Sequence, residues 1–244
     1  MRPALLVFRR EFAGYFATPV AGVFLIVFLA LAAGMTFLVS GFFERGQAEL
    51  SGFFFWHPWL YLVLMPAIAM RLWAEERRIG TIELLMTLPV QPWQIVVGKW
   101  LAAWAFAALA LVLTMPLWIT VNVLGSPDNG VILSSYVGSW LMAGAFLALA
   151  AAISALTKSQ VLAFIGATAV SFLFVMAGFD LVISAVRPWA PGFVIDAVRS
   201  MSFFAHFQHI TDGVLELPSI VFFVSLIVFC LWLNVRIVEV KKAA

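Results

Sequence analysis

A run of 25 residues from Pro19 to Phe43 contains no charged side chain. A helix of about 20 apolar residues crosses the hydrocarbon core of a bilayer, whereas the core of a signal peptide is shorter. The chain is 64% hydrophobic and 11% charged, against about 25% charged residues in soluble domains. A water-soluble fold of this size could not bury so much apolar surface. The sequence therefore predicts a membrane protein whose first apolar run is a retained span.

Five further apolar runs follow the first one along the chain. Polar turns separate several of them, among them GSPDNG at 125–130 and TKSQ at 157–160. Pro66 and Pro116 are expected to bend their helices, because proline lacks the N–H that continues the helical hydrogen bonding. The six apolar runs therefore predict an all-α polytopic membrane protein with six transmembrane helices in a single domain, residues 1–244. The spans are expected at 19–43, 53–73, 95–124, 131–156, 161–179 and 218–235.

Two span ends carry residues suited to the membrane surface. The aromatic opening of the second span, FFFWHPW at 53–59, predicts a belt of rings at one interface. Lys99, near the start of the third span, is expected to extend its ammonium to the lipid headgroups. These features would fix the depth at which both spans sit.

The distribution of positive charge predicts the orientation of the chain. Eleven of its 14 Lys and Arg residues fall at the N-terminus, in 71–99, at Lys158 or at the C-terminus, and three fall on the opposite side. Cytoplasmic loops of membrane proteins carry the excess of Lys and Arg. Both termini and the loop at 74–94 are therefore expected in the cytoplasm. The net charge of +2 is too small to indicate a nucleic-acid partner.

Residues 1–18, before the first span, are expected to form an amphipathic helix at the membrane interface. Three charged residues, Arg9, Arg10 and Glu11, occupy other helical angles than the apolar ones. The alternative is an ordinary positive flank that orients the first span. The apolar face of the predicted helix consists of Leu5, Phe8, Phe12, Tyr15 and Phe16.

A long segment at 180–217 separates the fifth and sixth predicted spans and is expected on the external side. Residues 193–212 predict one helix or two short ones, too polar to span and too apolar to stand free. They should lie at the interface or re-enter the membrane shallowly. The spacing of His206, His209 and Asp212 could hold a metal, but a polar stripe on an interfacial helix is the preferred interpretation.

The motifs of several enzyme classes are missing from the sequence. Gly98-Lys99 is followed by Trp100, so the glycine-rich loop that binds ATP in P-loop proteins is not present, and no His-Glu-x-x-His occurs. Charges inside the spans are nearly absent, although ion-coupled carriers need them. Cys230 lies in an apolar run and is expected to act as a small hydrophobe. The chain is expected to be neither an enzyme nor a cofactor-binding protein, and any transport would need an external energy source.

The densest charge cluster lies between the second and third spans, in RLWAEERRIGTIELLMTLPVQP at 71–92. Glu75 and Arg78 are spaced to pair on one helix face, and Gly80 permits a bend. Thr81 is a good N-cap for a second short helix, with Glu83 in its first turn. The apolar face of that short helix consists of Ile82, Leu84, Leu85, Met86 and Leu88. An apolar helix face that lies outside the membrane and is flanked by charged residues predicts a contact site for a soluble partner.

The stretch EERRIGTIELLMTLPV closely resembles the signature that follows the second span of ABC-2 type exporter permeases. The order of parts is also similar to that family: an N-terminal amphipathic helix, six spans and a helical external insertion. The segments FRREFAGYFATPVAGVF, GKWLAAW and HFQHITDGVLELPSIVFF look most like the branch of gliding-motility and nitrous-oxide-reductase-maturation permeases.

The resemblance implies a permease dimer, homodimeric rather than heterodimeric, in a bacterial inner membrane. Two cytoplasmic ABC ATPase subunits would hold ATP and Mg and dock on residues 75–92. The implied coupling residues are Glu75, Glu76, Arg77, Arg78, Gly80, Thr81, Glu83, Leu84, Leu85 and Leu88. The implied contacts of the interfacial helix are Phe8, Arg9, Arg10 and Phe12. The residues implied at the external gate are Arg199, His206 and His209.

Three functions remain open at this point. The first is the permease subunit of an ATP-driven exporter. The second is a membrane anchor that relays ATPase strokes to a periplasmic or membrane-anchored accessory protein while nothing crosses. The third, a membrane-embedded enzyme, is disfavoured by the missing motifs.

Overall fold

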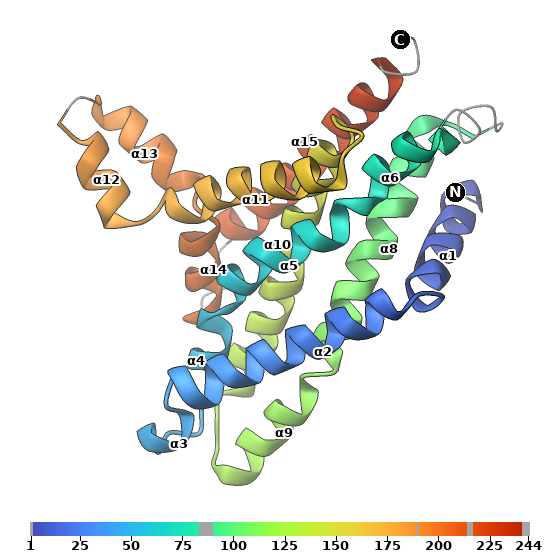
Figure 1. Ribbon diagram of the computed structural model, residues 1–244. Coiled ribbons are helices and arrows are strands. Elements are labelled where there is room, and N and C mark those ends of the chain that lie inside the picture. The colour runs from blue at the N-terminus through green and yellow to red at the C-terminus, as the bar shows by residue number, and fades with distance from the viewer. Residues whose placement is uncertain (1, 83–89, 189, 214–216, 241–244) are drawn as a thin grey trace.

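The computed structural model describes residues 2–82, 90–188, 190–213 and 217–240 (Figure 1). These residues are helical with short connections and contain no strand. Helices long and apolar enough to cross a membrane cover Pro19–Arg45, Pro92–Leu124, Asn129–Ser154 and Leu217–Val240. The prediction of an all-α polytopic membrane protein is therefore confirmed.

Two of the six predicted spans take a different form from the other four. The fifth is α11, Gln160–Met176, which is apolar and 17 residues long. The second is divided into the three helices α4, α5 and α6, with breaks at Trp56 and Met70. Helices α4, α5 and α6 cover Ser51–Phe55, His57–Ala69 and Arg71–Ile79. The exact number of spans stays a prediction.

The first and third spans are also interrupted, although each remains one apolar unit. Helix α2, Pro19–Gly34, continues into a π-helix, η1, at Met35–Val39, and a short α3 covers Phe42–Arg45. The third span divides into α8, Pro92–Val112, and α9, Met115–Leu124. The division falls next to Pro116, as predicted, because proline cannot donate the hydrogen bond that would continue α8.

Helix α10, Asn129–Ser154, lies at the centre of the bundle and packs against α5, α8, α11, α14 and α15. Many of its residues are Ala, Gly or Ser, so neighbouring helices approach it closely. Trp104 of α8 stacks on Trp140 of α10 with ring centroids 4.0 Å apart, and each indole N–H donates to the other's carbonyl. The last helix, α15, Leu217–Val240, packs along α10 and buries Cys230, as expected for a small hydrophobe.

The aromatic opening of the second span is only partly exposed: Phe55 is 43% exposed, and the other rings are buried or half-buried. Phe53, Phe54 and His57 are buried. His57 Nδ1 lies 2.7 Å from Ser139 Oγ on α10, and the Tyr61 hydroxyl lies 2.7 Å from the same oxygen. The prediction of an aromatic belt is therefore wrong for these residues, because their helical spacing turns them toward α10.

The insertion between the fifth and sixth spans forms three short helices. They are α12, Asp180–Val186, α13, Gly192–Ser200, and α14, Phe203–Thr211. Residues 193–212 thus form two short helices, one of the two predicted forms. Helix α14 buries Phe203 and Phe207 against α10, α11 and α15, whereas α12 and α13 project away from the bundle (Figure 1).

The charged parts of the chain gather at one end of the bundle. The start of α1, the end of α6, the start of α8 and the end of α15 all lie at the upper right in Figure 1. Helix α1 covers Arg2–Phe16 and packs along α8. The short helix α3 and the end of α9 lie at the opposite end (Figure 1).

Candidate functional site at the charged end of the bundle

Helix α6 carries the first half of the predicted contact segment and is anchored in the bundle by its own first turn. Leu72, Trp73 and Ala74 are buried. The hydroxyl of Ser154, at the end of α10, accepts hydrogen bonds from the Trp73 and Ala74 N–H groups and donates to the Met70 carbonyl. A side chain of α10 therefore satisfies backbone groups freed by the break at Met70. This anchor fixes the direction in which the charged turns of α6 leave the bundle.

The exposed side of α6 carries ion pairs between its own side chains. Arg71 Nε lies 2.9 Å from Glu75 Oε2, and Arg78 Nη2 lies 3.9 Å from Glu75 Oε1. The predicted pairing of Glu75 with Arg78 is thus confirmed, and Arg71 joins it. Arg77, another predicted contact residue, is half-buried.

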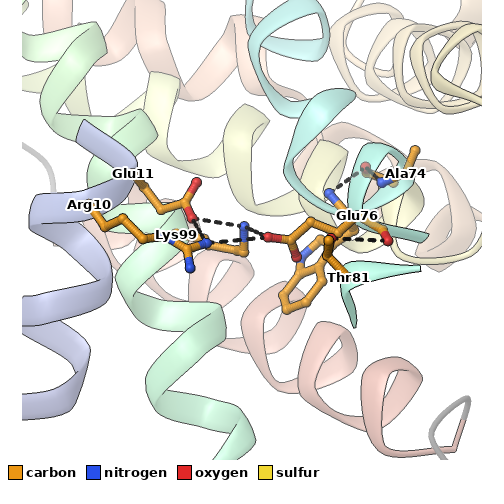
Figure 2. Close-up of polar contacts among 8 residues, drawn as sticks. Arg10, Glu11, Ala74, Glu76, Thr81 and Lys99 are labelled. Atoms are coloured by element: carbon orange, nitrogen blue, oxygen red, sulfur yellow. Dashed lines mark hydrogen bonds and ion pairs between the residues drawn. The ribbon is translucent and has the colours of Figure 1, made fainter. Parts of the chain in front are cut away.

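Gly80 ends α6 with a φ of 81°, a left-handed conformation that glycine adopts without steric cost. This confirms the predicted bend. Thr81 and Ile82 are again helical, and the Thr81 hydroxyl donates back to the Glu76 carbonyl over 3.4 Å (Figure 2). The predicted contact residues Glu83, Leu84, Leu85 and Leu88 lie outside the described residues.

The structure places Lys99 at the centre of this site rather than at the membrane surface. Its side chain is 2% exposed. Its ammonium lies 2.8 Å from Glu76 Oε1 of α6 and 3.2 Å from Glu11 Oε1 of α1 (Figure 2). It also lies 5.4 Å from the centre of the Trp73 ring. The prediction that Lys99 extends to the headgroups is wrong, because two carboxylates hold its ammonium inside the protein.

Arg10 completes this group of charges, which we call the ion cluster: Arg10, Glu11, Glu76 and Lys99. Arg10 Nη2 lies 2.7 Å from Glu11 Oε1 and 3.6 Å from Glu76 Oε1. The cluster joins α6 and α8 to α1, which lies more than 50 residues earlier in the sequence. Buried charges are stable only when they are paired, so each of these helices depends on the others for its charge balance.

The two carboxylates of the ion cluster have different electrostatic surroundings. Burial raises the pKa of the Glu76 carboxyl, and the attraction of Lys99 only partly offsets this effect. Burial acts in the same direction on Glu11, but Lys99 and Arg10 outweigh it and hold the pKa of that carboxyl below its usual range. As the pH falls, Glu76 therefore takes up a proton before Glu11 does.

Helix α1 packs on α8 with a face that includes one charged and one aromatic residue. Glu11 turns toward α8, and Tyr15 stacks on Phe106 with centroids 4.9 Å apart. Leu5 and Phe16, expected on the face turned to the membrane, are 59% and 52% exposed. The periodicity of α1 predicted its amphipathic character but not the position of Glu11, because a carboxylate with a buried cation opposite it can lie on the packed face.

A close approach of the two backbones makes this arrangement possible. A Cβ added to Gly98 would meet the Ala4 carbonyl oxygen at 2.7 Å and Val7 Cβ at 2.9 Å. Only glycine leaves enough space there for α1, and Lys99, the next residue, then reaches Glu11. Of the predicted N-terminal contact residues, Arg10 belongs to the ion cluster, Phe8 stacks on Phe12 at 5.7 Å, and Arg9 is exposed.

The residues predicted for the external gate make different contacts in the structure. Arg199 Nη2 lies 3.8 Å from Asp180 Oδ1, and this pair links α13 to α12. His206 Nδ1 lies 3.2 Å from Ser219 Oγ, and the imidazole stacks on Phe222, whereas His209 is exposed. Among the described residues no three His, Cys, Asp or Glu side chains are grouped to hold a metal.

Lys99 and Glu11 are the residues of the site that the sequence analysis did not identify. A signal was available, because Lys99 is the only charged residue in the 21 residues of α8. An ionisable side chain within an apolar span is a candidate functional residue. Its partners are not apparent from sequence, since they lie on two other helices.

The geometry of the site suits mechanical coupling. A charged, partly exposed helix end is tied by buried ion pairs to two other helices, so a force on α6 reaches α1 and α8. No curated protein matches the chain. A family model described as ABC-2 family transporter protein matches residues 18–239, which is most of the chain. The match is to the family as a whole, and assignment to the gliding-motility and nitrous-oxide-reductase-maturation branch stays a prediction. The chain belongs to the ABC-2 transporter family, and it is a multi-pass permease subunit of the kind that associates with a cytoplasmic ABC ATPase.

Proposed function

We propose that this chain is the membrane subunit of an exporter in a bacterial inner membrane, with residues 75–92 docked on two cytoplasmic ATPase subunits. Both termini face the cytoplasm in this proposal, and a second copy of the chain completes the transporter. ATP and Mg bind to the partner subunits, and this chain supplies the path and the mechanical connection. The N-terminal helix α1 lies at the cytoplasmic interface.

The observation that carries the proposal is the ion cluster. A docking segment transmits force only if it is tied firmly to the spans, and α6 is tied to them twice. Ser154 holds its first turn, and Lys99 holds Glu76 at 2.8 Å. The buried cation connects the same point to α1 through Glu11, so a displacement of the docking segment moves both helices together.

The experiment is a copurification with one variant on each side of the bundle. Leu85→Asp should release the ATPase from the detergent-solubilised complex while the chain still inserts, because a charge is placed on the proposed apolar docking face. Leu181→Asp is the matched control, since Leu181 lies on α12 and is 82% exposed. An ATPase that stays bound to the Leu85→Asp variant would contradict docking at 75–92.

A second candidate is a relay that moves an accessory protein and translocates nothing. The observation that favours it is the projection of α12 and α13, which exposes Leu181 and Phe193 at 82% and 74%. Crosslinking from these two positions tests it. A relay predicts one stoichiometric partner there and an ATPase activity that depends on this partner, whereas an exporter predicts ATPase activity that rises with substrate.

A further inference from the structure

A pocket of about 610 Å³ opens beside the ion cluster, between α1, α2, α5, α6 and α8. Its volume lies within the roughly 300–1,000 Å³ of known ligand sites. One part of the wall is apolar and includes Val23 and Val27 of α2 and Leu64 of α5. The other part is polar and includes Arg10, Arg71 and Glu76. The pocket is therefore amphipathic along its length.

The apolar part of the pocket is open on the side of α2. Val20, Val23 and Val27 line the pocket and are 52%, 58% and 38% exposed. Helix α2 contains no charged residue and is long enough, with its continuation to Arg45, to cross a membrane. Hydrocarbon is the natural surrounding of such a helix. An acyl chain could therefore enter the pocket from the bilayer without passing through water.

The polar part of the pocket holds equal numbers of positive and negative side chains. Its cations are Arg10, Arg71 and Lys99, and its carboxylates are Glu11, Glu75 and Glu76. Arg10 and Arg71 are the reachable cations, at 60% and 38% exposed, whereas Lys99 is enclosed at 2%. A headgroup with one positive and one negative charge matches this wall better than a purely anionic headgroup. The carboxylates of the wall would repel an anionic headgroup.

Two polar atoms of the pocket wall have no partner among the described residues. They are the Tyr15 hydroxyl oxygen and Glu76 Oε2, and both are buried. Burial raises the pKa of the Tyr15 hydroxyl, which therefore keeps its proton. Both oxygens can accept hydrogen bonds, so a ligand with N–H donors can bond to each of them, and the Tyr15 O–H can in turn donate to an acceptor on the ligand. A buried polar group without a partner is uncommon in folded proteins, and here two of them line one pocket.

We propose that this pocket binds one phospholipid with a zwitterionic headgroup that bears a primary ammonium, as in phosphatidylethanolamine. The ammonium lies near Glu76 and Tyr15, and the phosphate lies near the guanidinium groups of Arg10 and Arg71. An acyl chain follows the apolar wall between α2 and α5. Lipid binding at this pocket does not require the ATPase partner. The lipid proposal can therefore fail while the proposed exporter function holds, and the reverse is also true.

The test is a lipid titration of the full-length chain in mild detergent, followed by native mass spectrometry. Phosphatidylethanolamine, phosphatidylcholine and phosphatidylglycerol with identical acyl chains are compared. We expect one phosphatidylethanolamine per chain, bound about tenfold more tightly than either of the others. Phosphatidylcholine lacks N–H donors, and phosphatidylglycerol lacks the positive charge. Equal or tighter binding of either lipid overturns the proposed headgroup.

A pair of variants tests the position of the site. Val23→Trp fills the open side of the pocket and should weaken phosphatidylethanolamine binding about tenfold. Val228→Trp on α15 is the matched control, because Val228 is 61% exposed and does not line the pocket. Unchanged binding to a folded Val23→Trp variant would place the lipid elsewhere. The comparison of headgroups on the unmodified chain keeps the proposal testable if this variant does not fold.

Discussion

The ion cluster and the α12–α13 pair are two charged regions that differ in how their charges are held. Lys99 is 2% exposed and lies 2.8 Å from Glu76, whereas Arg199 is 52% exposed and lies 3.8 Å from a fully exposed Asp180. Both regions contain a basic and an acidic residue on different helices. Only the first encloses a charge, the Lys99 ammonium, with two largely buried carboxylates beside it.

The difference shows that burial, rather than charge itself, determines what an ion pair contributes. Exposed pairs contribute about 0–1 kcal/mol, because water screens them and side-chain entropy opposes them. Removing one partner of a buried pair costs about 3–5 kcal/mol, since the remaining charge stays buried without a counterion. We therefore expect the ion cluster to be sensitive to substitution and the α12–α13 pair to be tolerant.

The largest effect is expected for Lys99→Leu. It leaves Glu11 and Glu76 buried beside each other, with only Arg10 for compensation, and should destabilise the chain by about 3 kcal/mol. Thermal melting in detergent measures the stability, and ATP-dependent function should fall with it. Lys158→Leu, at an exposed turn residue, should change neither. If both variants melt alike, the cluster contributes no more than a surface lysine.

An intermediate effect is expected for Gly98→Ala. The added methyl group would come within 2.7 Å of the Ala4 carbonyl oxygen, so α1 must move away from α8, at a cost of about 1–3 kcal/mol. Protease sensitivity of α1 should increase, and the melting temperature should fall. Gly22→Ala is the control, because nothing lies within 4 Å of a Cβ at Gly22. A Gly98→Ala variant as stable as this control would show that the approach of α1 is not constrained.

The smallest effect is expected for Arg199→Ala. Its carboxylate partner is fully exposed, so water replaces the ion pair, and the melting temperature should not change measurably. A fall as large as that of Gly98→Ala would contradict the comparison of the two regions. Loss of transport at an unchanged melting temperature would instead support the predicted role of Arg199 at the external gate.

The sequence predicted most of the helical architecture, because hydrophobic length is a local property. It also predicted the Glu75–Arg78 pair and the bend at Gly80, which depend on neighbours within one or two turns. It did not predict that Lys99 binds Glu76, 23 residues away, or Glu11 on another helix. Long-range pairs depend on how helices rotate against one another, and periodicity does not fix that rotation when a polar residue lies on the packed face.

The buried rings of α4 illustrate the same limit. Phe53 and Phe54 are typical of a membrane interface by composition, yet both are buried. Composition alone does not distinguish a ring at the headgroups from a ring packed against a small-residue helix. The abundance of Ala, Gly and Ser in α10 was visible in the sequence, but the helix that would face it was not.

Helix α10 also joins the two ends of the bundle as one continuous helix. Near one end, Ser154 bonds the backbone of α6, and near the other, the Ser134 hydroxyl donates to the Ile210 carbonyl of α14 over 3.4 Å. The helix rises by about 30 Å over the 20 residue steps from Ser134 to Ser154. A tilt of α6 that kept its bonds to Ser154 would pull on α10 and, through Ser134, on α14. Motion at the charged end would then reach the opposite end through one continuous helix.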